Sequence, residues 1–251
     1  MSKKILLWAT AVIVTLAFVV FQRATGPTNA VKATIVINNK ECKVKFPRSV
    51  TTDQTEITFN TDGQIKQGTL YWRDHNSQKA FEPIAFEITG DSNLAVAIPN
   101  KERLDKIDYY ITLNDTTIFA QQPLVLRYKD SVPAVWLIAH IVLMFCSMLF
   151  AVYGLFMCFG KGQRVKRYLK LTIWTLLLGG LIFGAVVQKF AFGVYWSGFP
   201  FGNDITDNKT LIALLALLAV LPLRNKTYFR YFVIVSYLIM LVVYCIPHSM
   251  S

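Results

Sequence analysis

The chain has 251 residues, of which 54% are hydrophobic, and its formal net charge is +11. This composition excludes a single ordinary soluble domain and makes membrane-spanning segments the first feature to look for. Residues 22–132 hold 14 basic and 13 acidic residues, whereas the rest of the chain holds 12 basic and two acidic ones. The excess positive charge lies between apolar segments and not along one continuous face, so the sequence predicts no nucleic-acid partner.

Five hydrophobic runs predict helices that contact a lipid bilayer. The stretch between the first two runs is polar and alternating, which predicts a separate β domain. We therefore expect a transmembrane anchor at 1–22, an exterior domain at 23–131 and a four-helix transmembrane domain at 132–251. The runs themselves are 5–21, 133–159, 171–187, 211–223 and 228–246.

Basic residues cluster at three places that alternate with these runs, as the positive-inside rule requires of cytoplasmic segments. The N-terminus is then cytoplasmic, while the β domain, the loop 188–209 and the C-terminus lie on the outer side. The clusters are Lys3 and Lys4; Lys161, Arg164, Lys166, Arg167 and Lys170; and Arg224, Lys226 and Arg230.

The first run has two interpretations, a retained anchor or a cleaved signal peptide. Its apolar core of 17 residues exceeds the ~7–15 residues usual in a signal peptide. Gln22 and Arg23 follow it directly, and only a weak cleavage pattern, TNA at 28–30, comes later. The sequence favours a retained anchor, and the orientation of the rest is the same in both cases.

The exterior stretch contains nine short β-type segments, separated by turn-forming sets such as NNK, TDG and DHNSQ. Their spacing of about ten residues favours a β-sandwich. The segment RLDKIDYYITLNDTTIFA resembles the penultimate hairpin of immunoglobulin-like and fibronectin-III-like domains, in which Tyr109 or Tyr110 would occupy the tyrosine-corner region. That resemblance implies a fold and no activity.

Neither His75 nor the cysteines indicate a cofactor or metal site. His75, beside Asp74 in a turn, has no partner nearby in the sequence, so we expect a solvated histidine. The four cysteines form no CxxC motif, so neither a zinc site nor a redox dithiol is indicated.

The run 211–223 is too short to span a membrane. Its 13 residues make about 20 Å of helix against a hydrocarbon core of ~30 Å. Because basic residues follow at once, the helix must begin earlier, near Ile205. Asp204 or Thr206 would then be the N-cap, with Asp207 in the first turn.

The loop before this helix, FGVYWSGFPFGNDITDNKT at 192–210, holds both acidic residues of the membrane half, Asp204 and Asp207. Its aromatic residues suit the aromatic belt at the headgroup level. The alternative is a folded cap, with glycine turns and a stiffening Pro200, over a polar pocket at the outer leaflet. The expected cap and pocket residues are Tyr195, Trp196, Asn203, Asp204, Asp207, Asn208 and Lys209.

Two histidines lie on the outer side of the membrane half. His140 is about eight residues into the run 133–159, and His248 follows the last run. Each is explained by a structural role, as a hydrogen-bonded membrane histidine or an interfacial one. Together they are also the minimum for a haem b or copper site between helices.

Three stretches, QKFAFGVYWSGFPFGNDITDNKT, FQRATGPT and IPHS, together resemble an uncharacterised bacterial inner-membrane protein family. The resemblance implies an N-terminal anchor, an immunoglobulin-like exterior domain and four C-terminal transmembrane helices. It therefore also implies that the chain lies in a bacterial inner membrane with its β domain in the periplasm. It implies no particular activity.

Three functions fit these features, and a transporter fits less well because the chain has no internal repeat. The favoured one is a non-catalytic interaction or assembly subunit whose β domain binds a membrane or periplasmic protein. The second is a redox membrane subunit that holds haem b or copper through His140 and His248. The third is an outer-leaflet enzyme on a lipid-linked substrate, with Asp204, Asp207 and His140 as acid–base candidates and Lys209 holding a phosphate or orienting a carboxylate.

Overall fold

The computed structural model describes residues 3–26, 28–37, 40–60, 65, 67–89, 93–114, 116–160 and 164–246. The chain divides into two compact units. The helical unit joins Met1–Pro27 to Val132–Ser251, and the β unit is Thr28–Ser131.

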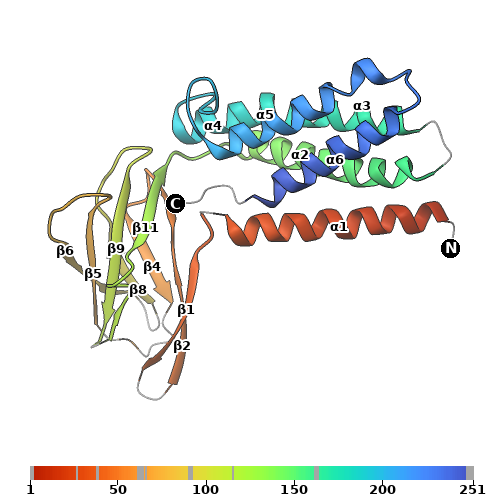
Figure 1. The fold of residues 1–251 in the computed structure, drawn as a ribbon. Helices are drawn as coiled ribbons and strands as arrows, with labels where there is room; N and C mark the ends of the chain where they lie inside the picture. Colours follow the sequence, from red (N-terminus) through yellow and green to blue (C-terminus); the bar gives the residue numbers. More distant parts are fainter. Residues whose placement is uncertain are drawn as a thin grey trace. The chain divides into compact units, whose positions relative to one another are not determined.

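The helical unit contains six α-helices in its described part, and Figure 1 shows their course. The third is continued by a π-helix, η1 (Leu177–Phe183), which leads directly into the fourth. The α-helices are α1 (Lys3–Thr25), α2 (Ala134–Cys158), α3 (Val165–Leu176), α4 (Gly184–Phe192), α5 (Ile205–Leu218) and α6 (Phe229–Cys245).

Four helical segments are long and apolar enough to cross a membrane: Lys3–Thr25, Ala134–Cys158, Val165–Phe192 and Ile205–Leu223. The last run of the sequence forms α6, an apolar helix of 17 residues that is shorter than these. Many large apolar side chains on the helices are exposed, as a lipid-facing surface requires. The chain is therefore a candidate multi-span membrane protein, as the sequence predicts.

The N-terminal helix packs into the helical unit through one face. Ala11 is fully buried on that face, and Thr15 is 6% exposed. Trp8 stacks on Tyr153 of α2, and the side-chain amide of Gln22 donates to the carbonyl of Tyr244 on α6. α1 thus has specific side-chain contacts with α2 and α6.

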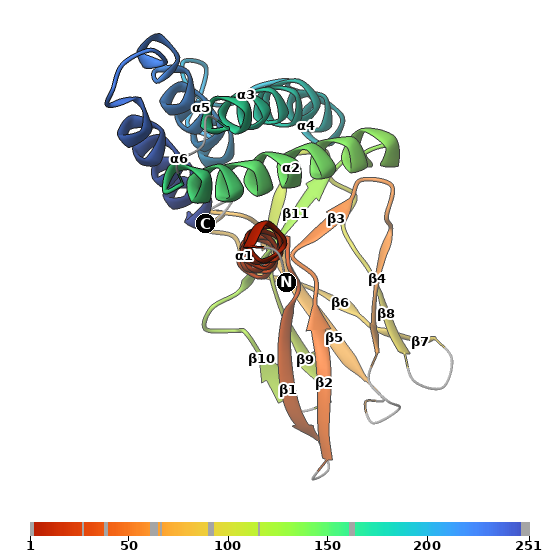
Figure 2. The same cartoon turned by 90° about the vertical axis from the view of Figure 1, so that its right-hand side faces the viewer.

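The β unit contains eleven strands in its described part, arranged in three sheets that do not close on one another. β1 and β2 form a two-stranded ribbon of their own (Figure 2). A second sheet has the order β3-β11-β9-β5-β6 with β10 on β9, and a third has the order β4-β8-β7. The strands are β1 (Val31–Ile37), β2 (Lys40–Phe46), β3 (Ser49–Thr51), β4 (Glu56–Asn60), β5 (Gly68–Asp74), β6 (Glu82–Ala85), β7 (Glu87–Thr89), β8 (Asn93–Ala97), β9 (Lys106–Leu113), β10 (Thr116–Ile118) and β11 (Leu124–Lys129).

One hydrophobic core is shared by all three sheets. Alternating residues point into it: Ile35 and Val44 from the ribbon, Ile57 from β4 and Ile111 from β9 are all buried. This alternation is the pattern that predicted strands from the sequence, and it is confirmed.

The immunoglobulin-like fold itself is not confirmed. β3 pairs in parallel with β11, and the segment 80–88 is divided between two sheets. Tyr109 is buried, and its hydroxyl donates to the carbonyl of Pro47 at 2.7 Å, 62 residues upstream. A tyrosine corner bonds to backbone only a few residues upstream. What the structure shows is a β region with open sheets.

Candidate functional site

The helix α5 begins at Ile205 and has Asp204 as its N-cap. One oxygen of the Asp204 carboxylate accepts the backbone N–H groups of Thr206 at 2.8 Å and Asp207 at 2.9 Å. An N-cap of this kind stabilises a helix by about 1 kcal/mol. The early start expected from the length of the run 211–223 is thus confirmed.

The carboxylate of Asp207 holds the loop that precedes α5. Its Oδ2 accepts the backbone N–H of Ser197 at 2.7 Å and that of Gly198 at 3.1 Å, and it lies 3.2 Å from the Ser197 hydroxyl. The side-chain oxygen of Asn208 accepts the backbone N–H of Phe199 at 2.6 Å. Two consecutive side chains of the first helical turn therefore satisfy three successive N–H groups of the loop.

Two glycines allow the loop to adopt this course. Gly193 ends α4 with a φ of 81°, the left-handed region that favours glycine at a helix end. Gly198 is buried, and a Cβ placed on it would lie 2.7 Å from the side-chain oxygen of Asn208 and 2.7 Å from the Cβ of Asp207. The bonds to Asp207 and Asn208 therefore need a residue without a side chain at 198.

Two further side-chain hydrogen bonds hold the loop. The Gln188 amide donates to the Ser197 hydroxyl at 2.5 Å, and the Trp196 indole N–H donates to the carbonyl of Phe199 at 3.1 Å. Tyr195 is 60% exposed and Phe201 is 84% exposed. The loop is thus folded on its own hydrogen bonds, while exposed aromatic side chains remain available to an aromatic belt.

Lys209, only 8% exposed, lies one residue beyond Asn208 in the same helix. Its ammonium group donates to the carbonyl of Ile246, which follows α6, at 2.7 Å. The carbonyls at the end of a helix lack intrahelical donors, so a lysine here ties the start of α5 to the end of α6.

His140 lies on α2 and bonds to the π-helix. Its Nδ1 is 2.8 Å from the carbonyl oxygen of Gly179, which also accepts the N–H of Gly184 five residues on. Because a carbonyl can only accept, Nδ1 is the donor in this bond. A π-helical turn inside an α-helix is rare and frequently marks a functional site.

The residues predicted for the site thus separate into distinct positions. Asp207 and Asn208 bond to the loop and Asp204 caps α5, whereas Lys209 bonds toward α6 and His140 bonds to η1. Asn203 is exposed just before the N-cap. His248 lies outside the described residues. No group of three or more His, Cys, Asp or Glu suited to a metal ion occurs among the residues that the structure describes.

The structure shows a partner for His75 that the sequence did not indicate. Its Nδ1 lies 2.6 Å from a carboxylate oxygen of Asp108, a residue of β9 that is 9% exposed. The Nε of Arg73 is 3.7 Å from the other oxygen of the same carboxylate. His75 lies in a turn and its side chain is 29% exposed, so it is partly solvated as expected. The carboxylate partner was not expected, because it comes from the antiparallel pairing of β5 with β9, which places Asp108 opposite Arg73.

A shallow hollow of about 470 Å³ lies beside His75. Its lining has two lysines and two aspartates, and one pair is bonded, Lys101 to Asp74 at 2.5 Å. The charges balance, so the hollow has no preference for an anion or a cation. Its lining residues are Asp74, His75, Lys101, Leu104, Asp105 and Lys106.

A scan against protein-family models finds no match for the chain, and a search of curated proteins finds none.

Proposed function

We propose that the chain is a non-catalytic interaction or assembly subunit of a bacterial inner membrane, and that its β unit binds a membrane or periplasmic protein partner. The observation that carries the proposal is the use of the loop's carboxylates. Asp204 and Asp207, the only acidic residues of the membrane half, both bind backbone N–H groups. A catalytic acid or base is needed at a reacting proton, whereas here the Asp204 carboxylate caps α5 and the Asp207 carboxylate holds the loop.

The distribution of basic residues supports a cytoplasmic N-terminus, with the β unit and the C-terminus in the periplasm. The guanidinium of Arg230, at the start of α6, donates to the carbonyl of Gly160, which follows α2, at 2.7 Å. Two of the basic segments therefore meet at one end of the helical unit, as a single cytoplasmic face requires. The loop containing Asp204 joins the end of α4 to the start of α5, which are the helix ends opposite to the basic segments.

The packing of α1 supports a retained anchor. A signal peptide is removed and so has no place in the mature fold. Here Trp8, Ala11 and Gln22 make contacts with α2 and α6. We propose that residues 1–22 are the anchor, 23–131 the periplasmic domain and 132–251 the four-helix domain with the loop 188–209 as its cap.

The proposal is tested by isolating the full chain from native membranes in a mild detergent and weighing the complex by native mass spectrometry. We expect a second protein in fixed stoichiometry with the chain. The Asp204→Asn variant, which keeps a good N-cap, should retain the same complex and any growth phenotype that the gene confers. A chain without a stoichiometric partner, or a folded Asp204→Asn variant without function, would contradict the proposal.

A second function, a haem b or copper subunit, is favoured by one observation. Histidine ligands of metals usually donate their other ring N–H to a carbonyl or carboxylate, which leaves the ligating nitrogen free. His140 has this arrangement, with Nδ1 donating to Gly179. Its second ligand would be His248. A purified chain with no Soret band and no bound copper by mass spectrometry would remove this function.

A further inference from the structure

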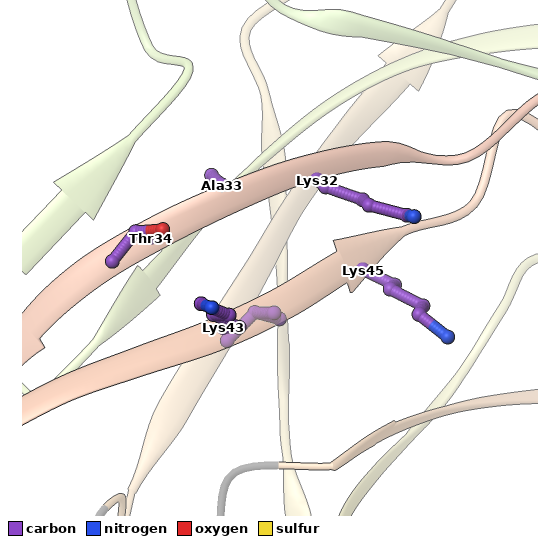
Figure 3. Close-up of a pocket in the computed structure, with 6 residues that line it drawn as sticks. Lys32, Ala33, Thr34, Lys43 and Lys45 are labelled. Carbon is purple, nitrogen blue, oxygen red and sulfur yellow. The ribbon is translucent and has the colours of Figure 1, made fainter. Parts of the chain in front are cut away.

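The outward face of the β1–β2 ribbon carries three lysines close together. Lys32 on β1 and Lys45 on β2 are direct cross-strand partners, and Lys43 is paired in the same way with Thr34. All four side chains are exposed. Figure 3 shows Lys32 and Lys45 extending in the same direction beside a hollow of about 230 Å³.

This arrangement places like charges directly opposite each other. Side chains at opposed positions of an antiparallel pair have Cβ atoms about 4.5–5.5 Å apart, and like charges there destabilise the pairing. Among the described residues, no carboxylate lies within ion-pair distance of these three ammonium groups. Glu41, the acidic residue of β2, is opposite Val36, farther along the ribbon. An added anion would therefore relieve a repulsion that the fold leaves in place.

The backbone of β1 is also incompletely paired. In the described part of the β unit β1 pairs only with β2, so its second edge presents N–H and C=O groups to no strand. The inner face of the ribbon is already used, because Ile35 and Val44 lie in the core. The surfaces of the ribbon that a partner could bind are therefore the free edge of β1 and the lysine face.

We propose that this ribbon is the docking surface for an extended acidic segment of a partner protein, which adds as a strand to the free edge of β1. The inference rests on the proposed function and supplies the chemistry of its partner. Alternate side chains of an added strand lie on one face, so Glu or Asp at every second position would share the outer face with the lysines.

A protein strand fits this surface better than a lipid headgroup does. Anionic headgroups would neutralise the lysines, but they have no alternating N–H and C=O groups to pair with the edge of β1. An acidic strand satisfies both the charge and the backbone. Lysines on an edge strand also discourage aggregation. If that were their only role, the ribbon would not bind an acidic peptide.

The test uses the full chain in phosphatidylcholine nanodiscs and a fluorescein-labelled ten-residue peptide that alternates Glu and Thr. We expect saturable binding by fluorescence anisotropy, weakening as salt rises. A peptide with five Glu followed by five Thr has the same charge without the alternation, and it should bind at least fivefold more weakly. Equal binding of the two peptides would overturn strand addition.

The decisive variant is Lys45→Glu, with Lys79→Glu as its matched control. Lys45→Glu replaces the repulsion with Lys32 by an attraction, so its unfolding temperature should be equal to or above that of the wild type, and misfolding cannot explain a loss of binding. We expect it to weaken the alternating peptide at least tenfold. Lys79 is an exposed lysine of the β unit outside the ribbon, and its reversal should change binding less than twofold. Equal effects of the two variants would overturn the proposal.

Two outcomes separate this inference from the proposed function. A native complex that survives Lys45→Glu, together with no peptide binding to the wild type, would refute the acidic strand and leave the interaction role standing. Peptide binding by a chain that has no partner in native membranes would refute the interaction role instead. Capture of phosphatidylglycerol vesicles through Lys45, without peptide binding, would replace the protein segment by a lipid surface.

Discussion

Trp8 of α1 stacks on Tyr153 of α2, with ring centroids 3.9 Å apart and ring planes inclined by 17°. Tyr168 of α3 completes the cluster, with its centroid 4.8 Å from that of Tyr153. Aromatic pairs contribute about 0.5–1.5 kcal/mol beyond the area they bury. The first helix is therefore joined to the rest of its unit by specific side-chain contacts.

Truncation of this aromatic contact should destabilise the helical unit. We expect Trp8→Ala to cost about 1–3 kcal/mol, less than the 3–5 kcal/mol of a fully buried tryptophan, because Trp8 is only half-buried. Thermal unfolding of the full chain in detergent measures the loss. Ile13→Ala, at a position 67% exposed, is the control and should cost much less. Equal losses would show that α1 has no specific packing.

Removal of the Asp207 carboxylate should release the loop 193–204. Asp207→Ala leaves the N–H groups of Ser197 and Gly198 without their acceptor, at a cost of about 1–3 kcal/mol. Hydrogen exchange followed by mass spectrometry should show faster exchange in this loop and little change in α2. Asp204→Asn is the control, since asparagine also caps helices well. Unchanged exchange in Asp207→Ala would contradict the role assigned to this carboxylate.

Addition of a methyl group at Gly154 should force α2 away from α6. A Cβ at this position would lie 2.8 Å from Cζ of the buried Tyr237. Overpacking of this kind costs about 1–3 kcal/mol, measurable by thermal unfolding. Gly160→Ala is the control, because the nearest atom to its Cβ would be 3.7 Å away. The double variant Gly154→Ala/Tyr237→Leu should lose less than the sum of its single changes if this contact is the cause.

The β unit should lose stability in alkaline solution through two buried tyrosines. Burial raises the pKa of Tyr109, an effect that nearby Arg48 partly opposes, and burial together with Asp105 raises the pKa of Tyr128. The folded state therefore holds protons that the unfolded chain releases near pH 10. The stabilisation is complete below about pH 10 and declines as pH rises toward the folded-state pKa values.

Denaturant unfolding at a series of pH values, with tyrosinate absorbance near 295 nm, checks this dependence. Tyr109→Phe also removes the hydrogen bond to Pro47, at a cost of about 1 kcal/mol at neutral pH. It should reduce the alkaline loss of stability. An identical pH dependence in the variant and the wild type would contradict the assignment.

Local rules of length and capping predicted much of the helical unit. The start of α5 at Ile205, with Asp204 as its cap, follows from a run that is too short to span a membrane. The same argument placed Asp207 in the first turn, but not its bond to Ser197. That contact depends on a backbone turn that no residue pattern encodes uniquely. The partner of His75 was missed for a related reason, because strand register is a non-local property.

The division of the segment 80–88 was also beyond local reasoning. It looks like one strand, yet β6 pairs with β5 in one sheet and β7 pairs with β8 in another. At the change of sheet, the backbone N–H of Phe86 bonds to Gly68 at 2.9 Å, and its ring packs against Phe59. Phe86 is partly buried against the shared core where the strand breaks, and the alternation of the sequence does not show this non-local contact.

The π-helix η1 sets the rotational position of α4 around the helix axis relative to α3. Successive residues of an α-helix are rotated by about 100° around its axis. A deletion that turned η1 into regular α-helix would turn α4, and with it Gly193 and the loop, by a similar angle relative to α3. Asp207 on α5 would then no longer face Ser197. The hydrogen bond from His140 to the Gly179 carbonyl is made to this wide turn. It therefore stabilises the turn on which the rotational position of α4 depends.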